Sequence, residues 1–77
     1  MTPATSAEAL FTSPLQPSEH PTVAQVRAAI RRSLVMHHGA QGCAADCAAE
    51  YGEHPDIAVP RMRWALSEVD TLVTTGL

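Results

Sequence analysis

The chain has 77 residues, near the lower size at which one hydrophobic core is stable alone, and alanine makes up much of its 45% apolar content. Its net charge of −3 excludes the strongly basic composition that is typical of nucleic-acid-binding domains, and no segment approaches the roughly 20 apolar residues of a membrane span. We therefore expect one small domain that does not enter a membrane and that completes its core as a homodimer or with a partner protein.

The N-terminal sequence and the two cysteines bear on where the protein resides. The first residues, rich in Thr, Pro, Ser and Ala, carry neither the basic start nor the apolar core of a secretory signal. We therefore expect a cytoplasmic protein in which Cys43 and Cys47 stay reduced. A disulfide between them would also distort a helix, since they stand four residues apart.

Residues 1–21 are expected to form a flexible, irregular arm ahead of a helical domain that spans residues 22–77. This arm holds four of the six prolines, together with Ser and Thr residues that favour turns. An alternative is one helical turn that begins with a capping box from Thr5 to Glu8. That turn would place three apolar side chains on the body of the protein, namely Leu10, Phe11 and Leu15.

Residues 23–38 form the clearest predicted helix. Thr22 is a suitable N-cap, Gln25 completes a capping box, and Gly39 stands just beyond the end as a C′ residue. The apolar residues of one helical face recur at steps of three, four and four: Val23, Val26, Ile30 and Leu34. Arg27 and Arg31 share a different face, with Arg32 beside them.

A second helix is predicted over residues 42–51. Cys43, Cys47 and Tyr51 recur every four residues among alanines, which predicts a narrow buried stripe. Gly52 ends this helix, and Pro55 disfavours its continuation through His54.

A third helix is predicted over residues 57–74, capped by Asp56 and with Pro60 in its first turn. Its apolar face comprises four residues at steps of four, three and four: Met62, Leu66, Val69 and Val73. Because no segment has the alternation of a β-strand, the predicted fold is all-α, a small three-helix bundle with an irregular N-terminal arm.

Residues 43–69 resemble the helix-turn-helix DNA-binding superfamily, including the winged-helix pattern in which the sequence AAE-x-G precedes a recognition helix. Ala48 supplies the small residue four positions before the turn glycine, Gly52. Cys47 and Tyr51 supply the apolar residues just before it. The resemblance covers about 27 residues, and no wing follows them.

This resemblance implies a small regulatory protein that binds double-stranded DNA, as a dimer, through the helix after Pro55. It would place Arg61, Arg63 and His54 near phosphates or base edges of the major groove. We expect Arg27 and Arg31 to join this surface if the fold brings them to the same side of the molecule as Arg61 or Arg63.

The alternative is a non-enzymatic helical interaction module or accessory subunit. Four carboxylates and no basic residue occupy residues 43–56, where they would face the phosphates of bound DNA. Arg61 and Arg63 also lie about 200° apart on a helix, so they cannot both face one wall of a groove. Pairing of the arginines with Asp46 and Glu50 would favour this alternative.

Cysteine and histidine side chains are the candidates for metal binding or catalysis. His37, His38, Cys43, Cys47 and His54 contain residue types that hold zinc, but two cysteines one turn apart among alanines are typical of small buried side chains. A Cys–His catalytic pair would lack an oxyanion hole and a polar pocket. We therefore expect no metal, no cofactor and no enzymatic activity.

Overall fold

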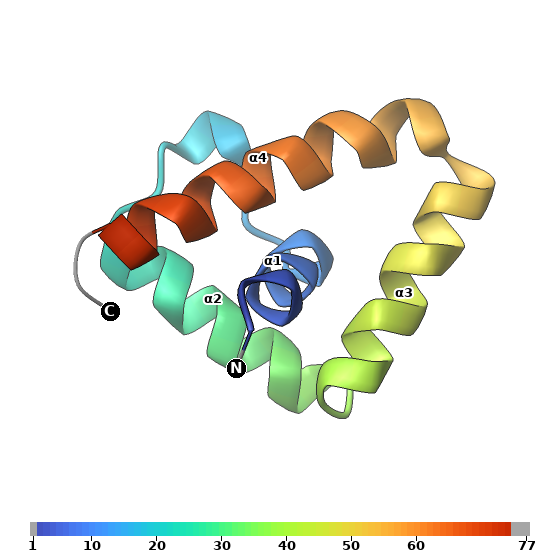
Figure 1. The fold of residues 1–77 in the computed structure, drawn as a ribbon, viewed down its shortest axis with the longest axis horizontal. Coiled ribbons are helices and arrows are strands. Elements are labelled where there is room, and N and C mark those ends of the chain that lie inside the picture. Colours follow the sequence, from blue (N-terminus) through green and yellow to red (C-terminus); the bar gives the residue numbers. More distant parts are fainter. Residues whose placement is uncertain (1, 75–77) are drawn as a thin grey trace.

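Four α-helices make up the computed structural model of the protein, which describes residues 2–74. The helices are α1 (Pro3–Thr12), α2 (Val23–Met36), α3 (Ala40–Glu53) and α4 (Pro55–Thr74), and a single 3-10 turn, η1 (Pro17–Glu19), precedes α2. None of residues 2–74 forms a β-strand, so the predicted all-α class is confirmed. The helices α2, α3 and α4 form a frame around α1, which is seen end-on in Figure 1.

The N-terminal segment differs most from the sequence-based prediction. An irregular arm was expected, but residues 3–12 form α1, so the three-helix bundle is corrected to a globule of four helices. Thr2 caps α1 by accepting a hydrogen bond from the backbone N–H of Thr5 at 3.1 Å, and Pro3 fits the first turn. The helix therefore begins before the alternative capping box from Thr5 to Glu8. As that alternative predicted, Leu10 and Phe11 are buried, and Leu15 packs partly buried against the core.

The core is built around α1. Leu10 and Ala9 are fully buried, and Ala7 and Phe11 nearly so. These residues do not lie on one face, because neighbouring helices enclose α1 from three sides. The alanines allow those helices to approach closely, which an amphipathic pattern does not reveal.

The predicted start of α2 is confirmed, and its end is two residues earlier than expected. Thr22 and Gln25 form the capping box, with hydrogen bonds of 3.2 and 2.8 Å between their side chains and backbone N–H groups. Val26 and Ile30 are buried as predicted. The helix ends at Met36 instead of residue 38.

The turn between α2 and α3 uses a histidine where a glycine was expected. His38 adopts the left-handed conformation with φ 63°, and the N–H of Gly39 donates to the carbonyl of Leu34 at 2.7 Å. This is a Schellman motif with His38 at C′, although asymmetric side chains disfavour that conformation. Gly39, with φ 90°, instead precedes α3 as its N-cap residue.

The stripe predicted on α3 is partly confirmed. Cys43 and Cys47 are buried, but Tyr51 is 38% exposed and stacks on Phe11, with ring centroids 6.1 Å apart. The helix spans residues 40–53 rather than 42–51, and Gly52 lies inside it.

One residue, His54, connects α3 to α4. Its N–H donates to the carbonyl of Glu50 at 2.7 Å, and its own carbonyl accepts from the N–H of Ala58 at 2.9 Å. Consequently α4 begins at Pro55, before the predicted cap Asp56, and Pro60 lies in the second turn rather than the first.

The buried face of α4 is rotated from the predicted one. Val69 is buried as expected and Met62 is half-buried, but Leu66 and Val73 are exposed. The buried positions are instead Ala58, Ala65, Val69 and Leu72. Alanines at two of these positions let α4 pack closely on α1, which leaves larger apolar residues on the outer side.

Because Leu10 is fully buried, we predict that Leu10→Ala lowers the free energy of unfolding by about 2–5 kcal/mol. Leu66→Ala is the matched control and should cost less than about 1 kcal/mol, since half of the Leu66 side chain is exposed. Urea denaturation followed by circular dichroism measures both. Equal losses would contradict the central position of α1.

The first turn of α3 lies very close to the end of α2 at Gly42, whereas Gly52 near the other end of α3 has open space around it. A Cβ at Gly42 would lie only 1.5 Å from the carbonyl oxygen of His37, whereas a Cβ at Gly52 meets nothing within 4 Å. We predict that Gly42→Ala destabilises the protein by about 1–3 kcal/mol. Gly52→Ala should stabilise it by about 0.5–1 kcal/mol through helix propensity. Thermal denaturation of the two variants measures these effects. If both substitutions stabilised the protein, the close contact between Gly42 and the carbonyl of His37 would be refuted.

Candidate functional site

Arg61 lies between α4 and the C-terminal end of α1. Its Nε donates to the carbonyl of Phe11 at 2.8 Å, and one terminal nitrogen donates to the carbonyls of Ser13 and Leu15 at 2.7 and 3.0 Å. The last carbonyls of a helix have no partner within the helix. The planar, forked guanidinium supplies a partner to one of these carbonyls, that of Phe11, and to the carbonyls of Ser13 and Leu15 just beyond the helix.

Two aromatic rings and partial burial affect the charge of this guanidinium. Its carbon lies 5.8 Å from the ring centroid of Phe11 and 5.0 Å from that of Trp64, within the range of cation–π attraction. Burial lowers the pKa of Arg61, and the Cys47 thiolate would oppose this shift. The negative end of the α1 dipole also favours the positive charge. Arg61 thus joins α4 to α1.

The other arginines and the histidine predicted for DNA binding differ from Arg61 in their exposure. Arg63 and Arg31 are exposed on α4 and α2, and His54 is exposed in the connection between α3 and α4. Arg27 is half-buried, and its Nε is enclosed without a hydrogen-bond partner. The structure therefore places Arg61 inward and Arg63 outward on the same helix.

The charged side chains of α3 pair differently from the expectation for an interaction module. Asp46 contacts His37, with 2.5 Å between Oδ2 and Nδ1. Among residues 2–74 no arginine forms an ion pair with Asp46 or Glu50. The expected pairing of arginines with the carboxylates of α3 is thus not formed within these residues.

Both cysteines lie in the core, as predicted. The Cys43 thiol points to the carbonyl of Ser33 at 3.7 Å, and the Cys47 thiol to that of Glu8 at 3.6 Å. Burial, reinforced by the nearby Glu8 carboxylate, raises the pKa of Cys47 to about 12. At neutral pH this group is a protonated thiol, which is a poor nucleophile. The described part of the chain contains no cluster of three or more metal-ligating side chains.

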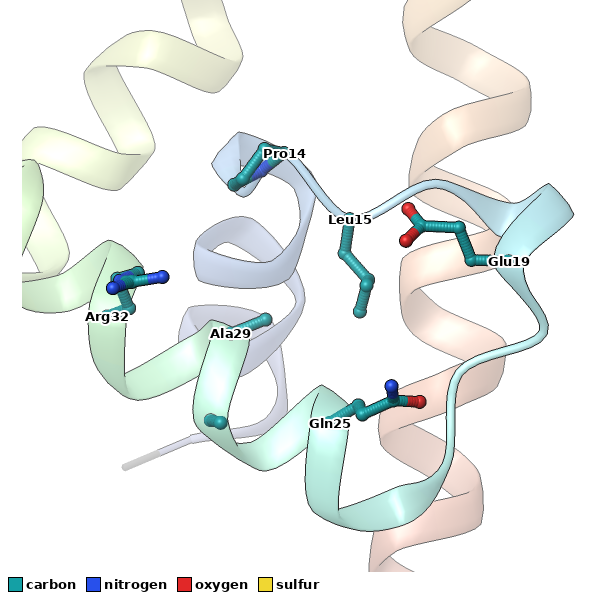
Figure 2. A pocket seen from close by; sticks show the side chains of 7 residues that line it. Pro14, Leu15, Glu19, Gln25, Ala29 and Arg32 are labelled. Atoms are coloured by element: carbon teal, nitrogen blue, oxygen red, sulfur yellow. The ribbon is translucent and has the colours of Figure 1, made fainter.

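A cavity of about 610 Å³ lies between α2 and the segment that follows α1. Figure 2 shows Leu15 projecting into it, with Glu19 and Gln25 nearby and Arg32 farther along α2. The Glu19 carboxylate accepts from the N–H of Gln16 at 2.7 Å, and the Gln25 amide oxygen accepts from the N–H of Thr22. These polar groups therefore cap backbone turns. The side chains that line the cavity include no nucleophile that Glu19 could activate.

The outer face of α4 carries a row of exposed apolar side chains. Val59, Leu66 and Val73 are 38%, 49% and 58% exposed, and they follow one another at intervals of seven residues. Together with the half-buried Met62 we call them the α4 stripe. Seven residues are nearly two helical turns, so these side chains share one face. The sequence predicted Met62, Leu66 and Val73 to lie in the core, whereas the structure exposes Leu66 and Val73.

Comparisons with protein-family models, with curated proteins and with solved structures found no match to this chain. No helix within residues 2–74 is long and apolar enough to cross a membrane. The surfaces of this chain are therefore what indicates its function.

Because Arg61 bonds three carbonyls, we predict that Arg61→Ala lowers the free energy of unfolding by about 2–3 kcal/mol. The free energy of unfolding of Arg61→Lys should lie between those of the wild type and Arg61→Ala, since lysine keeps the charge but not the forked geometry. Arg63→Ala, which removes an exposed arginine from the same helix, should change stability by less than about 0.5 kcal/mol. Urea denaturation measures all three, and equal effects of Arg61→Ala and Arg63→Ala would disprove the capping role.

Proposed function

We propose that this chain is a non-enzymatic protein-interaction module whose contact surface is the outer face of α4. The observation that carries the proposal is the α4 stripe, in which three large apolar side chains lie exposed in one line. Single exposed apolar residues are common on soluble proteins, whereas an aligned group of them is typical of a surface that binds another protein.

The other exposed apolar residues support this choice less well. Val35 and Met36 are 78% and 68% exposed, but they are adjacent in sequence at the end of α2 and form no line along the helix. Ile57 is exposed at the start of α4, on the opposite side from Val59, two residues away. A helix face that is apolar at regular intervals is the feature that a partner helix can pack against.

The absence of enzymatic activity is part of the proposal. The polar side chains beside the cavity near α2 are used as caps, and the high pKa of Cys47 leaves its thiol protonated. Neither arrangement supplies the paired nucleophile and base that covalent catalysis needs.

DNA binding is a second candidate function, because Arg31 and Arg32 are adjacent and exposed on α2. Exposed arginines contact phosphates, and such contacts make binding weaken steeply as salt rises. Exposed Arg63 would be the contact from α4, whereas Arg61 would support the helix from within. A gel shift at low ionic strength that weakens in Arg63→Ala would support this function, and no shift of any DNA would exclude it.

The interaction module is tested by photo-crosslinking in cells that produce the protein. A photoreactive p-benzoylphenylalanine replaces Leu66 in one variant and Ala45, an exposed residue of α3, in the control. We predict that the probe at position 66 gives a discrete covalent adduct with a protein, because partner side chains cover the α4 stripe. The probe at position 45 should give none.

The same experiment can refute the proposal. A lack of adducts from position 66, or equal adducts from both positions, would show that the outer face of α4 is not a contact surface. The adduct from position 66 should also disappear when Val59→Glu and Val73→Glu are added, since charges at these exposed positions oppose apolar packing.

A further inference from the structure

We infer that the partner of the α4 stripe is the α4 helix of a second copy of this chain, packed antiparallel. This inference rests on the proposed function and names the partner. It is carried by two features of the same face: the symmetric placement of its apolar residues and the placement of two unpaired charges beside them.

The apolar residues are arranged symmetrically about Leu66. Val59 lies seven residues before it and Val73 seven residues after it, and all three are exposed. When two such helices pack antiparallel around a two-fold axis at Leu66, each Leu66 meets its counterpart. Val59 of one copy then meets Val73 of the other, so every exposed member of this row contacts an apolar residue. Antiparallel two-fold packing is the isologous arrangement that one surface can make with itself.

The charges beside the stripe match the same arrangement. Arg63 and Asp70 are exposed, and each occupies the position four residues after a stripe residue, Val59 or Leu66. They therefore lie on the same edge of the apolar row, on the side away from the buried Ala58, Ala65 and Leu72. Within residues 2–74 neither side chain forms an ion pair.

Helix geometry decides which charges meet across the two-fold axis. Arg63 lies three residues before Leu66 and Asp70 four residues after it, which gives heights of about 4.5 and 6 Å from the axis at 1.5 Å per residue. In an antiparallel pair the Arg63 of one copy is thus opposite the Asp70 of the other, with an offset of about 1.5 Å that the long arginine side chain spans. The symmetry creates two such pairs. A parallel two-fold pair would instead place the charged edges of the two helices on opposite sides of the interface, so that Arg63 and Asp70 would not face one another.

The buried parts of α4 are compatible with this contact. Ala58, Ala65 and Leu72 pack against the body of their own chain, about 100° around the helix from the apolar row. A second helix can therefore approach the row from the solvent side. A single pair of helices buries less surface than a standard interface, so we expect association that depends strongly on protein concentration.

Charge reversal tests the pairing in sedimentation velocity over a concentration series. Wild-type protein should form dimers, and Arg63→Asp or Asp70→Arg alone should raise the dimer dissociation constant about tenfold, because each replaces two attractions by two repulsions. Combining both changes in one chain should restore the dimer. Mixing the two single variants should also restore it, as heterodimers in which every charge again faces its opposite.

Arg31→Asp is the matched control, since it reverses an exposed arginine on α2 and should leave the dissociation constant unchanged. Circular dichroism melts of the variants check that the fold is kept, as expected for exposed positions. The inference is overturned if the wild-type protein stays monomeric throughout the series. It is also overturned if the reversals have no effect, or if neither mixing nor combining them restores the dimer.

Failure of this inference is distinguishable from failure of the proposed function. A monomeric protein whose position-66 probe crosslinks to a different protein would refute self-association and support the interaction module. A monomeric protein without any adduct from position 66 would refute both.

Discussion

At the C-terminal end of α1, backbone carbonyls that no helical N–H can reach are enclosed by neighbouring helices, and Ser13 there is only 6% exposed. Arg61 supplies the missing hydrogen bonds from α4, while its guanidinium also contacts the rings of Phe11 and Trp64. A helix can lie at the centre of so small a protein only if its terminal polar groups find partners. Arg61 thus ties α4 to the end of α1, while the hydroxyls of Thr12 and Ser13 donate to the carbonyls of Ala9 and Leu10.

Local signals in the sequence predicted some elements well and others only in part. The start of α2 was predictable because Thr22 and Gln25 cap it through contacts within four residues. Of α1 only one helical turn was predicted, as the alternative to an irregular arm. The helix is enclosed on several sides and its buried residues include two alanines, so no single apolar face appears in its sequence. The turn at His38 escaped prediction as well, since glycine is the usual residue in that conformation and Gly39 stands next to it.

The candidate site shows the same limit. The spacing of Met62, Leu66, Val69 and Val73 correctly predicted a helix, but the spacing does not tell whether large apolar residues face inward or outward. Ala58 and Ala65 decided this by offering a flatter surface to α1. Similarly, Arg61 and Arg63 look equivalent in the sequence, and only the position of the end of α1 separates a buried cap from an exposed charge.

The bond between Arg61 and Phe11 joins residues that are 50 positions apart, and this separation has a consequence for how the protein forms. During synthesis, α1 leaves the ribosome long before the segment that caps it, so the first half of the chain has no means of enclosing its most apolar helix. The enclosure of α1 can therefore be completed only after α4 has been synthesised. Until that moment the nascent N-terminal segment exposes Leu10 and Phe11 to whatever chaperones attend the emerging chain.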